Sequence, residues 1–108
     1  LQTLNARFNK SGAKYPELIE RSRENVRLLH AAGVPILAGS DAPNPGTAHG
    51  ASIHEEMAQL VKAGLSNEAA LAAATSAPAA AFSLTDRGQI APGLRADILL
   101  VNGDPTVD

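Results

Sequence analysis

The residue best placed for catalysis is Asp41, which closely follows an unbroken apolar run at residues 34–38. In α/β folds, active sites lie at the C-terminal ends of buried strands. A carboxylate there can ligate a divalent cation or accept a proton from metal-bound water. However, Asp41 also opens a loop containing Pro43, Pro45 and Gly46, and an Asp in that setting often only caps a turn. Position alone leaves both roles open.

The histidines are the other candidates for chemistry. His49 and His54 lie five residues apart, whereas two metal-binding histidines on one helix usually lie three or four apart. This spacing is not a recognised ligand pattern, although the two side chains could still converge because His49 precedes the helix. A substrate contact is one role left open for His49, and His54 is expected to be exposed in the first turn of a helix. His30 lies beside an apolar helical stripe and is expected to be structural. Glu55 is expected to form a capping box with Ser52, which accounts for it without catalysis.

The composition excludes several classes of function. The chain has 108 residues, no cysteine and a formal net charge of -2, so disulfide scaffolds, thiolate metal sites and cysteine nucleophiles are excluded. Basic residues are scattered and aromatic residues are few, which disfavours nucleic-acid binding. No apolar run approaches the roughly 20 residues that span a membrane. No phosphate-binding glycine loop or Gly-x-Ser-x-Gly elbow is present. We expect a cytoplasmic protein that binds neither nucleic acid nor membrane.

Hydrophobic spacing predicts the elements that would position these side chains. Apolar residues recur at helical spacing between Pro16 and Gly33, and again from Ser52 to Gly64. Ser66 is typical of the N-cap of a third helix, and a short helix is expected to follow it. The continuous run at 34–38 predicts a strand covered on both faces. Two further strands are expected at residues 89–90 and 96–101.

One strand covered on both faces does not make a sheet. Such a strand needs parallel neighbours at both edges, and each parallel connection takes a crossover of a dozen or more residues. The sequence therefore predicts an α/β sheet most of which lies outside the chain. Either the chain is a fragment, for which its start at Leu1 also argues, or several copies pool their strands.

Four segments of the sequence follow one another in order: LLHAAGVPILAGSDA, HGASIHEEMAQLVKAGLSNEAALAAAT, APAAAF and DRGQIAPGLRADILLVNGDP. Together they resemble the C-terminal end of metal-dependent amidohydrolases, most closely the imidazolonepropionase-like and Xaa-dipeptidase-like members. The similarity extends from about residue 25 to the end of the chain.

The resemblance implies a C-terminal fragment of a (β/α)8 barrel, mostly helical within this chain, plus returning strands of a composite β-sandwich. Residues 1–84 would be the last α/β part of the barrel, and residues 85–108 would be the sandwich strands. Residues 34–38 would be the eighth barrel strand, and Asp41 would bind the metal and shuttle a proton. His49 would lie over the substrate, and Asp97 would be structural.

The same resemblance implies a divalent metal, commonly zinc, in a longer parent enzyme. The family's other ligands come from a His-x-His on the first strand, a Lys or Glu on the fourth, and histidines on the fifth and sixth. None of these segments is in this sequence, so the chain alone is expected to be inactive and to bind no metal tightly. The expected parent hydrolyses a C–N bond in a small amide, cyclic amide or peptide-like substrate.

A noncatalytic alternative is a helical module that self-associates. Apolar residues predicted to face a missing sheet would need partners, and a symmetric homo-oligomer would supply them. The residues concerned are Ile36, Leu37, Ile98 and Leu100.

Overall fold

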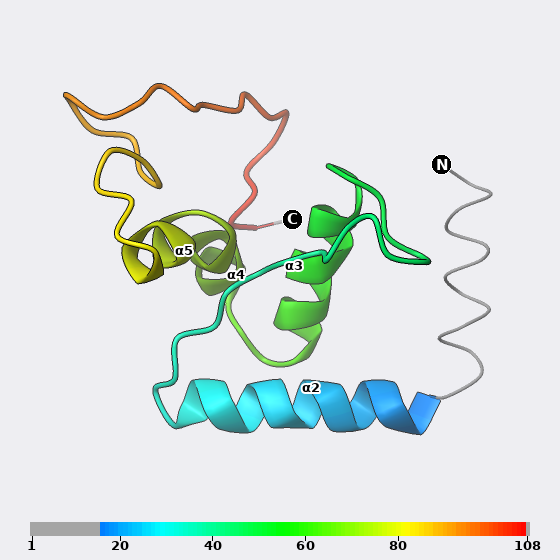
Figure 1. Cartoon of the computed structure of the whole chain (residues 1–108). Helices are drawn as coiled ribbons and strands as arrows, with labels where there is room; N and C mark the ends of the chain where they lie inside the picture. Colours follow the sequence, from blue (N-terminus) through cyan, green and yellow to red (C-terminus); the bar gives the residue numbers. More distant parts are fainter. Residues whose placement is uncertain (1–15, 108) are drawn as a thin grey trace.

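The computed structural model describes residues 16–107, and this part of the chain contains helices and irregular segments without a strand. Within these residues four helices follow one another along the sequence, and Figure 1 shows their arrangement. They are α2 (Pro16–Ala31), α3 (Ser52–Lys62), α4 (Asn67–Ala74) and α5 (Ser76–Ala81). The mostly helical character predicted for the chain is thus confirmed, and all four predicted helices are present.

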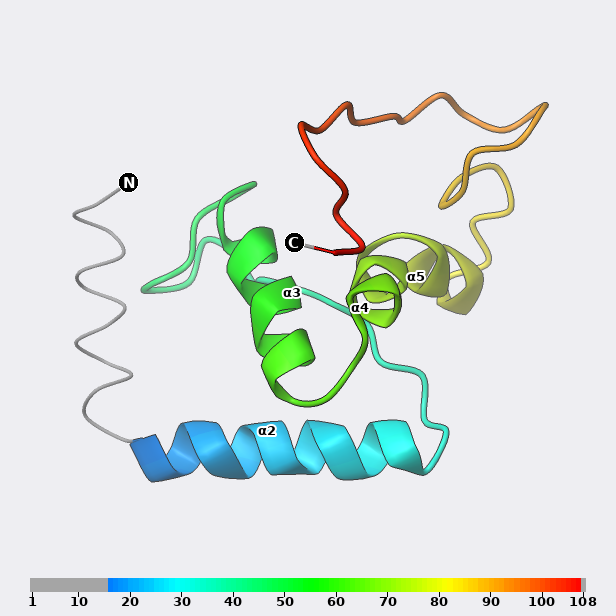
Figure 2. The same ribbon diagram turned by 180° about the vertical axis from the view of Figure 1, so that it is seen from behind.

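Helix α2 begins and ends where its sequence predicts. Pro16 occupies the first position, where a missing N–H costs no hydrogen bond. At the other end, Gly33 takes a left-handed φ of 75°, and the Val34 N–H returns to the Leu29 carbonyl at 3.0 Å. No residue of α2 is buried. The helix lies across the C-terminal end of α3 in both views (Figure 2), so most of its apolar stripe stays partly exposed.

The buried core lies where α3 and α4 meet. Four residues, each at most 5% exposed, form its centre: Leu60, Leu65, Ala70 and Ala73. Two of the four are alanines, whose single methyl buries little apolar area but lets elements approach closely. The Ser66 hydroxyl caps α4 by accepting from the Ala69 N–H at 3.1 Å, as predicted. The result is a small core that holds α3 and α4 together.

The prediction of a strand at residues 34–38 is wrong for the described structure, in which this segment is irregular. This segment crosses the core without a neighbouring strand, and Val34 is 42% exposed. Its main tertiary backbone bond runs from the Ala38 N–H to the Ala73 carbonyl at the end of α4, at 2.8 Å. Ile36 and Ala38 pack against the core. A strand exists only with a ladder partner, and the described residues provide none.

The strands expected at residues 89–90 and 96–101 are likewise absent from the described structure. Leu99 is 88% exposed and Leu100 is fully exposed. Figure 1 shows this part of the chain, in orange, running apart from the helices. The segment returns at its end, where the Asn67 side-chain amide donates to the Thr106 carbonyl at 3.1 Å. Without ladder partners, the apolar run has no face to cover it.

Candidate functional site

Asp41 begins a tight turn on the surface. The Asn44 N–H donates to the Asp41 carbonyl at 3.1 Å, and the Asn44 side-chain amide donates to Asp41 Oδ2 at 2.5 Å. The turn places Asp41 in the left-handed region, with φ of 47°. The turn-forming role that position left open is therefore present. Within residues 16–107, Asp41 Oδ1 accepts no hydrogen bond, so this oxygen is available to a ligand.

The rest of the loop is held by hydrogen bonds of its own. Both the backbone N–H and the hydroxyl of Thr47 donate to the Asn44 carbonyl at 2.9 Å. Ala48 and Ser52 form a reciprocal pair, in which the Ala48 N–H donates to the Ser52 hydroxyl at 2.9 Å and the Ser52 N–H to the Ala48 carbonyl at 3.1 Å. His49 lies in the sequence between these two hydrogen-bonded residues and is exposed.

The capping box expected from Ser52 and Glu55 is wrong. The N-cap of α3 is Ala51, which forms no side-chain cap, because the Ser52 hydroxyl is occupied by the loop N–H of Ala48. Glu55 instead accepts from the Gln59 side-chain amide at 2.5 Å and lies 3.8 Å from the Lys62 ammonium. Glu55 is thus accounted for by contacts along its own helix.

The described residues do not form a metal site by themselves. Between residues 16 and 107, His, Asp and Glu side chains nowhere gather in threes in a way that could hold an ion. Protein metal sites generally use three or four protein ligands. The exposed carboxylate of Asp41 fits one position in such a site and leaves the others to be supplied elsewhere.

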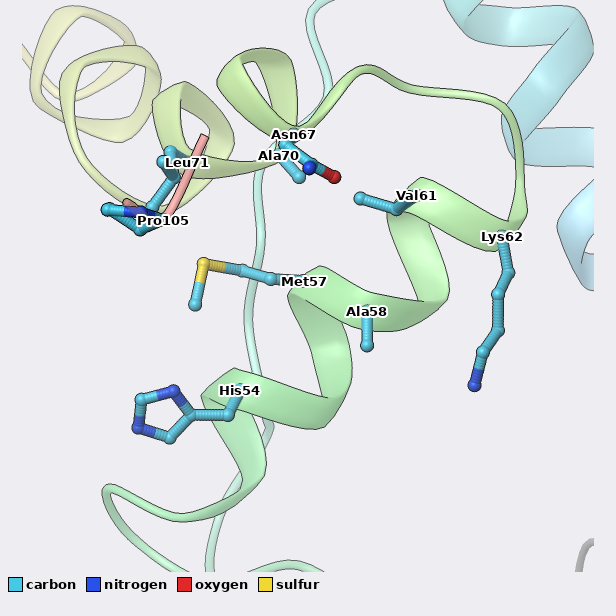
Figure 3. Close-up of a pocket in the computed structure, with 9 residues that line it drawn as sticks. All are labelled: His54, Met57, Ala58, Val61, Lys62, Asn67, Ala70, Leu71 and Pro105. Carbon is cyan, nitrogen blue, oxygen red and sulfur yellow. The ribbon is translucent and has the colours of Figure 1, made fainter. Parts of the chain in front are cut away.

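A groove with a volume of about 500 Å³ lies between α3 and α4. Figure 3 shows Met57 and Leu71 along its sides and Pro105 from the C-terminal segment closing one edge. His54 stands at one end and is exposed, as expected. Asp41 and His49 do not line this groove. Its lining is mainly apolar, so it can hold an apolar group but lacks a pair of acid and base side chains.

A charged cluster follows α5. The Arg87 guanidinium donates to Asp86 at 2.8 Å and holds the pKa of that carboxyl below its ordinary value. The Arg95 guanidinium lies 3.3 Å from the Asp97 carboxylate. The backbone N–H of Arg95 donates to the backbone carbonyl of Asp86 at 2.7 Å. These contacts join two ends of one loop. The structural role expected for Asp97 agrees with its place in this cluster.

Sequence reasoning missed two residues that matter locally. Asn44 was not singled out, although an Asp followed three residues later by an Asn within a proline-containing loop is a turn pattern. Pro105 lines the groove although it lies far along the sequence from α3 and α4. No local sequence pattern indicates that contact. His30 is exposed at the end of α2 and borders a smaller groove formed with Val34 and Ala69.

Comparison with known proteins identifies the family. The model of the amidohydrolase family matches residues 3–108, nearly the whole chain. The chain belongs to this family. The resemblance noted in its motifs is therefore confirmed, and it extends further toward the N-terminus than those motifs.

Curated relatives of this amidohydrolase chain fall into two groups. An adenine deaminase from Gluconobacter oxydans is 42% identical over 79 residues, which are 71% of this chain and 14% of the relative. An imidazolonepropionase from Cereibacter sphaeroides is 40% identical over 90 residues, 82% of this chain and 22% of the relative. The chain thus spans less than a quarter of these proteins. No solved structure matches it.

Family membership adjusts the reading of the fold. The amidohydrolase family indicates a barrel of the (β/α)8 type, and α2–α5 are consistent with a part of one. Adenine deaminases are a group that the sequence motifs alone did not indicate. None of the helices between residues 16 and 107 has the length and apolar character needed to cross a bilayer.

Proposed function

We propose that this chain is the C-terminal part of an amidohydrolase that cleaves a C–N bond in a small molecule with a metal-activated water. The observation that carries the proposal is the family match over residues 3–108. The names of the relatives, adenine deaminase and imidazolonepropionase, support hydrolysis at carbon–nitrogen bonds of nitrogen-containing rings. In this proposal, residues 1–84 belong to the barrel and residues 85–108 to a β-sandwich.

Asp41 is the proposed catalytic residue, as a metal ligand and proton acceptor. Its carboxylate is exposed at the start of the loop, and its Oδ1 is left open by the turn. Asp41 would be one ligand of a bound divalent metal, with zinc as the expected ion, and this metal would acidify a bound water. Asp41 would take the proton of that water and return it to the leaving nitrogen. The described residues provide one ligand to this site, so we expect the chain alone to bind zinc weakly.

His49 is the proposed substrate contact. It is exposed in the loop that follows Asp41. The two hydrogen bonds between Ala48 and Ser52 restrict the backbone on both sides of His49. An imidazole held on a restrained loop can donate to or accept from a polar group of a ligand. We assign it a role in binding.

The proposed substrates are small amides, cyclic amides or peptide-like molecules. The first compounds to test are imidazolonepropionate, a cyclic amide, and adenine, an aminopurine outside the amide class, since the relatives are named for them. We further propose a cytoplasmic enzyme that forms homo-oligomers and uses neither nucleic acid nor membrane as a partner.

The test is hydrolysis by the complete protein that carries this chain. We expect zinc-dependent release of ammonia or ring opening with at least one compound of this class. Asp41→Asn should abolish turnover, whereas Asp97→Asn, the same change at another exposed carboxylate, should retain it. Equal turnover of the Asp41→Asn protein and the wild type would reject the role of Asp41.

A second candidate function rests on the exposed tail. Leu99 and Leu100 are 88% and 100% exposed, and apolar side chains in a continuous exposed run favour association. The chain would then be a noncatalytic, self-associating helical module. Sedimentation at increasing concentration tests this. A dimer that is lost in Leu100→Lys but kept in Arg21→Glu would support the module, and a monomer at all concentrations would reject it.

A further inference from the structure

Among residues 16–107, the carboxylate of Asp41 has one protein donor, which binds one of its two oxygens. The Asn44 side-chain Nδ2 donates to Oδ2 at 2.5 Å. The backbone of Asn44 forms a separate set of bonds, donating to the Asp41 carbonyl and accepting from Thr47. The side chain of Asn44 is therefore not needed to close the turn, because its backbone already does so.

We propose that Asn44 is a positioning residue that fixes the Asp41 carboxylate and leaves Oδ1 as the atom that acts. An aspartate side chain can rotate and exchange its two oxygens. The amide of Asn44 removes this freedom by binding Oδ2, and the left-handed φ of Asp41 sets the direction in which the side chain leaves the backbone. This inference rests on the proposed role of Asp41, which it deepens.

The local conformation supports this role. Asp41 is one of two non-glycine residues with positive φ in the described chain, the other being Ser83. Aspartate tolerates this conformation better than most residues that carry a Cβ, particularly where local hydrogen bonds support it. Here the contacts are the backbone bond from Asn44 and the weaker approach of the Thr47 hydroxyl to the Asp41 carbonyl at 3.4 Å. The loop thus holds Asp41 in one conformation.

The geometry can be tested in the isolated chain, without activity. In nuclear magnetic resonance spectra, the bonded Nδ2 proton of Asn44 should exchange with solvent about fivefold more slowly than the side-chain protons of exposed Asn102. This difference should vanish in Asp41→Ala, whose circular dichroism should match the wild type. Equal exchange at Asn44 and Asn102 in the wild type would overturn the proposed hydrogen bond.

The functional consequence is tested in the complete protein. Asn44→Ala should lower kcat by about 10–100-fold, the usual effect of removing a group that orients a metal ligand, and leave KM unchanged. Asn44→Ser, which keeps a donor of shorter reach, should recover part of that loss. Asn102→Ala, the same change at an exposed asparagine, should keep wild-type kcat.

Thr47→Val separates positioning from bracing of the loop. This variant loses the hydroxyl bond to the Asn44 carbonyl but keeps the donor on Asp41. An equal fall in kcat for Thr47→Val and Asn44→Ala would overturn the positioning role. If Asp41→Asn abolishes turnover while Asn44→Ala keeps wild-type kcat, this inference fails and the proposed function stands. If Asp41→Asn itself keeps turnover, the proposed function fails first.

Discussion

The guanidinium of Arg23 holds the side-chain carbonyl of Gln59, 36 residues away, through two hydrogen bonds. Arg23 Nε lies 3.1 Å and Nη2 2.9 Å from Gln59 Oε1. This contact joins α2 to α3 at a partly buried position, whereas no residue of α2 is buried. Val26 of α2 packs against the core, and this polar contact is a further attachment of the helix to α3.

We predict that Gln59→Ala loosens α2 from α3. Loss of a charge-assisted hydrogen bond at a partly buried site costs about 1–2 kcal/mol. Helix α2 should then exchange its amide protons faster than α3 and α4 do, while the core around Leu60 keeps its protection. Hydrogen exchange measures this directly. Gln89→Ala, the same change on an exposed loop, serves as the control, and equal exchange in the two variants would contradict the prediction.

Gly88 is predicted to be irreplaceable by alanine. A Cβ at this position would lie 2.5 Å from the Ala79 Cβ and 3.0 Å from the Thr75 carbonyl, and its φ is +90°. Gly88→Ala should therefore cost about 2–4 kcal/mol through steric overlap and backbone strain, and should displace the loop from α5.

Gly93 provides the matched comparison. It also has a positive φ, +85°, but a Cβ there would meet nothing within 4 Å. Gly93→Ala should cost only the strain, about 1–2 kcal/mol. The chemical shifts of Ala79 and Thr75 report the packing of the loop. Changes of the same size in both variants would show that steric contact at Gly88 does not decide the effect.

Ser52 and Ser66, both predicted to cap a helix, should respond differently to substitution. Ser66→Ala removes the N-cap of α4 and should destabilise that helix by about 1 kcal/mol. Ser52→Ala should leave α3 in place, because its hydroxyl bonds the loop and not the helix. We expect Ser52→Ala to speed exchange at Ala48 alone. A loss of helical circular dichroism in Ser52→Ala comparable to that in Ser66→Ala would contradict this difference.

The C-terminal segment should loosen in acid. The hydroxyl and the backbone N–H of Thr106 both donate to the Asp104 carboxylate. Both bonds lower the pKa of that carboxyl below its ordinary value of 3.8, and the hydroxyl has the larger effect. A lowered folded-state pKa means that the contribution to stability is present above the unfolded value and is lost as pH falls through the folded one. The contact between Thr106 and Asn67 should weaken over the same acidic range.

Carbon-detected titration of Asp104 measures this pKa. Thr106→Val, which removes the hydroxyl but keeps the backbone donor, should raise the pKa of Asp104 toward its ordinary value. Thr3→Val is a matched control remote in sequence. An unchanged Asp104 pKa in Thr106→Val would show that the hydroxyl does not set it.

The helices were predictable because their signals are local. Pro16, Gly33 and Gly64 mark helix ends through backbone constraints that depend on the residue itself. The cap at Ser66 was likewise predictable from its sequence. The same rule failed at Ser52, because the Ala48 N–H, which lies before the helix, occupies the hydroxyl. Competition of this kind between two partners for one side chain depends on the path of the loop.

The strands and the site were less predictable for the opposite reason. An apolar run such as residues 34–38 indicates a segment suited to burial on both faces. A strand forms only when a neighbouring strand completes the hydrogen-bond ladder. Asp41 was identified from its place after that run, and the structure adds the hydrogen bond from the Asn44 side chain, although the Asp–Asn spacing in this loop is itself a turn pattern. What the sequence could not supply was the set of groups that would surround Asp41.

The most direct test of the central proposal is zinc-dependent C–N hydrolysis by the complete protein, measured for the wild type, Asp41→Asn and Asp97→Asn. The account predicts that Asp41→Asn loses turnover by several orders of magnitude while Asp97→Asn retains it. Turnover in Asp41→Asn equal to that of the wild type, with both proteins folded and carrying the same metal content, would contradict the account.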